Sequence, residues 1–88
     1  MDIMRVSGSS KTSKVAGAIA GIMREKGRVV LQAIGAAAVN QTVKAIALAR
    51  SFLQEDGIEI VLTLEMVDVE INDKVRTALK FSVEQRSQ

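Results

Sequence analysis

Two stretches of this sequence carry polar side chains whose types and spacing suit the binding of phosphate groups. The first is residues 8–14 (GSSKTSK), where small residues precede a predicted helix and leave backbone N–H groups open to an anion. The hydroxyl groups and the amines of Lys11 and Lys14 add donors. The spacing of a P-loop, G-x-x-x-x-G-K-[ST], is absent. The alternative interpretation is a helix start capped by Ser9 or Ser10, with its lysines in solvent.

The second stretch begins at Gly35 and ends at Lys44. At about 100° per residue, Asn40, Gln41 and Lys44 lie on one side of a predicted helix. Amides and an amine on one surface form hydrogen bonds to phosphates or bases. The alternative is the ordinary solvated side of a surface helix.

A third group consists of five carboxylates, Glu59, Glu65, Asp68, Glu70 and Asp73. Paired carboxylates take part in acid–base catalysis or hold metal ions, but charges along an exposed hairpin also prevent aggregation at sheet edges. The chain contains no His and no Cys, which removes the commonest general base and every thiolate ligand. We therefore expect a protein that is not an enzyme, with no catalytic residue, metal or cofactor.

Composition places these stretches in one small domain, residues 1–88, with 48% apolar residues to form a core. The first 50 residues have a charge balance of +6, and the remaining 38 have −4. With no Trp or Tyr and only Phe52 and Phe81, aromatic platforms for stacked bases are scarce. The longest uncharged stretch near the start, residues 15–23, is too short to span a membrane, and no signal-peptide cleavage site follows it. These features predict a cytoplasmic binding or assembly module.

Hydrophobic periodicity predicts the order βαβαββ. The expected strands are residues 1–7, 28–34, 58–71 and 74–84, the expected helices are 11–26 and 36–54, and the expected hairpin tip is Asn72-Asp73. Right-handed crossovers put both helices on one face of a four-stranded mixed sheet, which makes an α+β two-layer sandwich.

Two details of the pattern are unusual. The second helix has a wide apolar arc, which predicts that it packs on the sheet and also meets another subunit, with Leu48 and Phe52 as candidate interface residues. The apolar phase of the third strand changes near Met66-Val67. Because side chains alternate strictly along a strand, this change predicts a bulge or a twist away from the body.

Four segments resemble the stage V sporulation protein S family. They are Arg5-Val6-Ser7, residues 13–21 (SKVAGAIAG), residues 32–45 (QAIGAAAVNQTVKA) and residues 47–52 (ALARSF). The resemblance covers nearly the whole chain. It implies an Alba-like fold and a regulatory role in sporulation. Alba proteins are small basic proteins that bind chromatin and RNA and form dimers, so the resemblance also implies nucleic acid, DNA or RNA, and a homo-oligomer as partners.

By this resemblance, nucleic acid contacts the loop before the first helix and the start of the second helix. The corresponding residues are Ser9, Ser10, Lys11 and Lys14 in the loop region, and Asn40, Gln41 and Lys44 in the helix. Two positions depart from the Alba pattern: Ala36 replaces a basic residue, and the hairpin is acidic where Alba hairpins tend to be basic. Acidic arms repel phosphates. The alternative function is therefore a protein–protein assembly module that does not bind nucleic acid.

Overall fold

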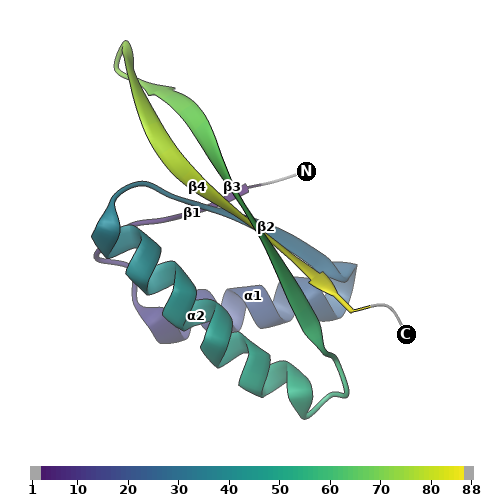
Figure 1. Cartoon of the computed structure of the whole chain (residues 1–88). Coiled ribbons are helices and arrows are strands. Elements are labelled where there is room, and N and C mark those ends of the chain that lie inside the picture. Colours follow the sequence, from purple (N-terminus) through teal and green to yellow (C-terminus); the bar gives the residue numbers. More distant parts are fainter. Residues whose placement is uncertain (1–2, 87–88) are drawn as a thin grey trace.

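A computed structural model describes residues 3–86 of the chain and has the predicted element order (Figure 1). The elements are β1 (Ile3–Val6), α1 (Thr12–Lys26), β2 (Arg28–Ala33), α2 (Ala36–Gln54), β3 (Ile60–Ile71) and β4 (Lys74–Gln85). Met1 and Asp2, which we expected in the first strand, lie outside the described residues. No helix in the described part of the chain is long and apolar enough to cross a membrane.

The four strands form one mixed sheet in the order β1-β2-β4-β3. β1 runs parallel to β2, whereas β4 runs antiparallel to both β2 and β3. Figure 1 shows both helices against one face, which we call the helix-side face; the other is the open face. This arrangement confirms the predicted two-layer sandwich, because each βαβ crossover returns its helix to the same side.

The core lies between the helices and the middle of the sheet. Ile19 and Met23 of α1, Leu53 of α2, Leu31 of β2 and Phe81 of β4 are all almost completely buried. α1 ends at Lys26 because Gly27 adopts a left-handed conformation (φ 76°) and its N–H donates to the Met23 carbonyl at 2.9 Å. α1 therefore stops where β2 has to begin.

β3 and β4 form a hairpin that is longer than the rest of the sheet. Their antiparallel register is continuous from Ile60 opposite Gln85 to Ile71 opposite Lys74, so the predicted bulge is wrong. The alternative prediction, a twist away from the body, is confirmed in Figure 1. β2 ends opposite Leu79, and residues 67–78 therefore continue as a two-stranded extension, which we call the arm. At about 3.3 Å per residue, its five pairs extend roughly 17 Å beyond the sheet.

Candidate nucleic-acid interface

The two stretches with phosphate-binding character come together at one end of the sheet. Val6, the last residue of β1, lies opposite Ala33, the last residue of β2. The strands are parallel, so the loops that follow them leave the sheet at the same edge and lead into the N-termini of α1 and α2. The arm extends from this edge as well. We call the loop of residues 7–11, the first turn of α1 and residues 36–44 of α2 the basic end.

Direct contacts hold the loop against α2. The Gln41 side-chain amide donates to the Ser10 carbonyl at 2.7 Å, in a partly buried position. Gly8 lies so close to α2 that a Cβ added to it would be 2.8 Å from the Cβ of Ala37. The residue at position 8 therefore has to be glycine for this fit. Gln41, which we predicted as a binding residue, positions the loop with its amide nitrogen.

The serines do not cap α1, so that prediction is wrong. The N-cap residue is Lys11, and no side chain accepts from the first turn of the helix. The Ser10 hydroxyl instead accepts from the Ser7 N–H at 3.0 Å, and the Ser7 hydroxyl lies 3.1 Å from those of both Ser9 and Ser10. The serines close a tight turn among themselves. The first N–H groups of α1 therefore remain open to solvent or an anion.

The start of α2 has the same character. Gly35 precedes it at φ 88°, and because glycine has no side chain, no side-chain hydrogen bond caps this helix either. Neither helix has an acidic residue in its first turn. Asn40 is exposed, while Thr42 is buried and donates to the Ala38 carbonyl at 2.8 Å. Two helix N-termini thus lie beside one another, and no acidic side chain in their first turns offsets their partial positive charges.

Three lysines belong to the basic end: Lys11 and Lys14 lie at the start of α1, and Lys44 lies in the third turn of α2. Lys11, Lys14 and Lys44 are exposed, and none belongs to the four ion pairs of residues 3–86. Those pairs lie elsewhere: Arg24–Asp56, Arg28–Glu84, Lys80–Glu65 and Arg86–Glu59. The amines at the basic end are therefore available to an external anion.

The arm separates its charges onto two faces, which the sequence alone did not indicate. Asp68 and Glu70 continue the helix-side face, since they alternate with Met66 in β3. Lys74 and Arg76 continue the open face, opposite Ile71 and Val69. Asn72 and Asp73 both have positive φ (51° and 64°), which confirms the tip and is typical of a two-residue hairpin turn. The arm is thus acidic on one side only.

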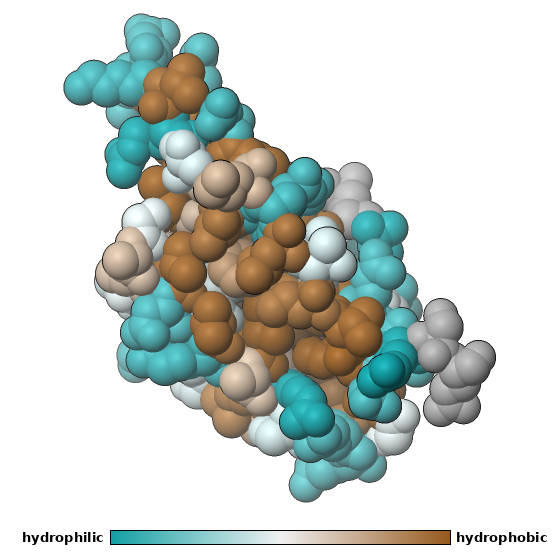
Figure 2. All heavy atoms as spheres, viewed as in Figure 1, coloured by the Kyte–Doolittle hydropathy of each residue, from teal (hydrophilic) through white to brown (hydrophobic). Residues whose placement is uncertain are grey.

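An uncovered apolar face lies along β3. The β4 residues Phe81 and Val83 are buried beneath the helices, but their β3 neighbours Leu64 and Leu62 are 55% and 43% exposed. α2 makes its main contacts with α1, β1 and β2, so β3 is left largely uncovered beyond Ile60, which still packs against the core. Together with Met66 (75% exposed), which follows them on the same face of β3, these leucines form what we call the β3 face. Figure 2 shows apolar side chains gathered across this side of the molecule.

The predicted interface residues lie on another flank of α2. Leu48 and Phe52 follow Gln41 by seven and eleven residues, so they share the flank that faces the loop before α1. Leu48 packs at the edge of the core, and Phe52 is 36% exposed. Sequence analysis missed the β3 face, although the single apolar phase from residue 58 to 66 was its signal.

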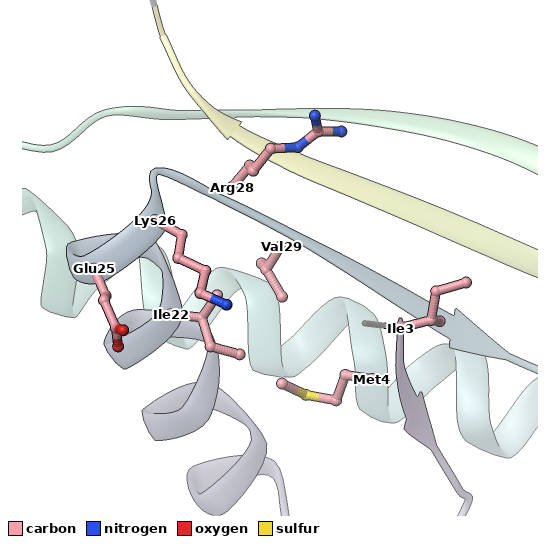
Figure 3. A pocket seen from close by; sticks show the side chains of 7 residues that line it. All are labelled: Ile3, Met4, Ile22, Glu25, Lys26, Arg28 and Val29. Carbon is pink, nitrogen blue, oxygen red and sulfur yellow. The ribbon is translucent and has the colours of Figure 1, made fainter. Parts of the chain in front are cut away.

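A hollow of about 550 Å³ lies at the end of the molecule opposite the basic end (Figure 3). Met4, Ile22 and Val29 form its apolar floor, with Lys26 and Glu25 at the rim. The guanidinium of Arg28 points away from it, on the side of Glu84, 3.8 Å from that carboxylate.

Within residues 3–86, no three His, Cys, Asp or Glu residues are grouped so as to hold a metal ion.

Comparison with known proteins supports the fold described above. Alba from Thermoplasma volcanium has a similar structure, with a TM-score of 0.63 over 98% of this chain and 100% of that chain, at 12% sequence identity. At that identity the likeness establishes an Alba-like fold. The family model for stage V sporulation protein S matches residues 2–86, nearly the whole chain. This chain belongs to the stage V sporulation protein S family.

Proposed function

We propose that this protein binds nucleic acid through phosphate contacts at the basic end, as a dimer or higher oligomer, in a regulatory and non-catalytic role. One observation carries the proposal: the fold brings the two stretches that we predicted to bind phosphates side by side, with Lys11, Lys14 and Lys44 outside every ion pair of the described residues. Phosphate oxygens are the anions that such donors bind in nucleic-acid-binding proteins.

The β3 face supports the oligomeric part of the proposal. A row of large exposed apolar side chains is typical of interaction sites, and a second copy of the chain offers the same surface in return. Three lysines per chain are few for tight binding, and a dimer doubles the number of phosphate contacts. The affinity that such phosphate contacts provide falls steeply as salt concentration rises and shows little sequence preference.

The proposal is tested by reversing charge at the basic end. The Lys11→Glu/Lys14→Glu variant should bind nucleic acid at least about tenfold more weakly than wild type at low salt. Its slope of log affinity against log salt should be shallower by about two for each bound chain. Lys26→Glu/Arg50→Glu is the matched control, because it makes the same change in net charge at exposed sites away from the basic end. If the two double variants bind equally well, the assignment of this interface is wrong.

A second candidate function is a protein–protein assembly module that does not bind nucleic acid. The β3 face together with the acidic side of the arm favours it, since Asp68 and Glu70 repel phosphates on that side. This function predicts a stable oligomer that shows no salt-sensitive binding to duplex DNA, single-stranded DNA or RNA. A stable oligomer that binds any of the three with a steep salt dependence supports the first function instead.

A further inference from the structure

A small hollow of about 290 Å³ adjoins the basic end on the open face of the sheet. Its lining residues are Arg5, Val6, Ser7, Gly8, Gln32 and Ile34. Ser7 and Gly8 belong both to the hollow and to the loop at the basic end. A ligand in the hollow therefore lies directly beside the loop at the basic end.

Two polar side chains of the hollow, Arg5 and Gln32, form no side-chain hydrogen bond or ion pair with any other described residue. Arg5 lies opposite Gln32, which in turn lies opposite Lys80, so these three side chains form a row across the open face. Gln32 is half-buried; its amide makes no hydrogen bond within residues 3–86, yet it stays accessible to solvent. Arg5 is exposed and takes part in none of the ion pairs described above.

These groups match the chemistry of a nucleobase. A planar guanidinium stacks on a base, a carboxamide pairs with the donors and acceptors at a base edge, and an aliphatic side chain such as Ile34 covers the ring. The volume lies at the lower limit of about 300 Å³ for small-molecule sites, which suits a single ring system. Arg5 also provides a planar stacking surface in a chain with only two phenylalanines, of which Phe81 is buried.

We propose that this hollow holds one unpaired base, so that the preferred ligand is single-stranded nucleic acid. The inference rests on the proposed function and specifies its substrate. A paired base in a duplex is stacked between its neighbours and cannot enter a side pocket, whereas single strands present their bases for stacking on protein groups.

The charges of the arm favour the same path. Lys74 and Arg76 lie on the open face, as the hollow does, whereas Asp68 and Glu70 lie on the helix-side face. A strand that places a base against Arg5 and Gln32 therefore continues toward these cations and away from Asp68 and Glu70. Glu65 also lies on the open face, but its carboxylate is paired with Lys80 at 3.6 Å.

The test compares a single-stranded oligonucleotide, the same oligonucleotide with abasic residues throughout, and a duplex, each by fluorescence anisotropy with the full chain. Abasic substitution removes the bases and keeps the phosphates. Wild type should bind the abasic strand about 5-fold to 150-fold more weakly than the normal strand, which is the range that stacking of one base contributes. It should also bind the normal strand more tightly than the duplex.

Two variants assign the effect to the hollow. Arg5→Lys keeps the charge but removes the planar stacking group, so it should weaken binding of the normal strand several-fold and leave the abasic strand unchanged. Gln32→Leu should do the same, and Arg50→Lys, on the exposed side of α2, is the control. Salt-sensitive binding that is equal for the normal and abasic strands, or that Arg5→Lys leaves unaltered, would overturn the base site while the proposed function stands. No binding to any probe would overturn both.

Discussion

Substitution of Gly8 by alanine tests whether the loop must sit directly on α2. The added Cβ would lie 2.8 Å from the Ala37 Cβ, whereas carbon atoms in contact are about 3.5–4.0 Å apart. The exposed loop has to move outward by about 1 Å. That movement stretches the 2.7 Å bond from Gln41 to Ser10 beyond hydrogen-bonding distance. We expect a loss of about 1 kcal/mol in the free energy of unfolding, the value of one partly buried neutral hydrogen bond.

Urea denaturation and nucleic-acid titration measure the two consequences separately. The Gly8→Ala variant should unfold at lower urea and bind nucleic acid more weakly, because its loop no longer lies beside α2. Adding Ala37→Gly removes the opposing Cβ and should restore binding, although glycine within a helix costs up to about 1 kcal/mol. Gln41→Ala should reproduce the binding defect and should not add to Gly8→Ala. A Gly8→Ala protein with wild-type stability and affinity would refute the close fit.

Three further results are expected. Leu64→Glu puts a charge on the β3 face without touching the core, and it should reduce the mass measured by light scattering from an oligomer toward a monomer; an unchanged mass would place the interface elsewhere. Gly21→Ala adds a Cβ in the interior of α1 that has no atom within 4 Å apart from the backbone of its own helix. It should therefore increase the free energy of unfolding by up to about 1 kcal/mol and raise the urea midpoint. Arg24→Ala should cost less than about 1 kcal/mol in the same assay, because its 2.6 Å pair with Asp56 is half exposed; a larger loss would show that this pair anchors the end of α2.

Sequence periodicity was sufficient for the fold. The glycine at position 27 and the nearly continuous apolar run of β2 fix where α1 ends and the central strand begins, and the crossover rule then sets the side of both helices. The prediction of capping serines failed because Ser7 and Ser10 bond to each other instead of to α1. Local sequence cannot distinguish these two uses of a serine hydroxyl, since both satisfy a backbone N–H.

The remaining features depend on relationships between distant segments. The hydrogen bond from Gln41 to Ser10 joins residues 31 positions apart, so no local pattern reveals it. The phase change after Met66 indicated a bulge, but the register is regular and the environment changes instead: beyond Met66 the strand leaves the body, and its apolar side chains occupy the open face of the arm. The β3 face likewise depends on which strand the helices leave uncovered.

The central claim is that the basic end binds phosphates, and salt dependence tests it most directly. Wild-type protein should be titrated with single-stranded DNA, RNA and duplex DNA over a series of salt concentrations. A dimer with three lysine contacts per chain on a single strand predicts a slope of about −4 for log affinity against log salt. Affinity that does not change with salt, or no binding at low salt by a protein that is oligomeric, would contradict the claim.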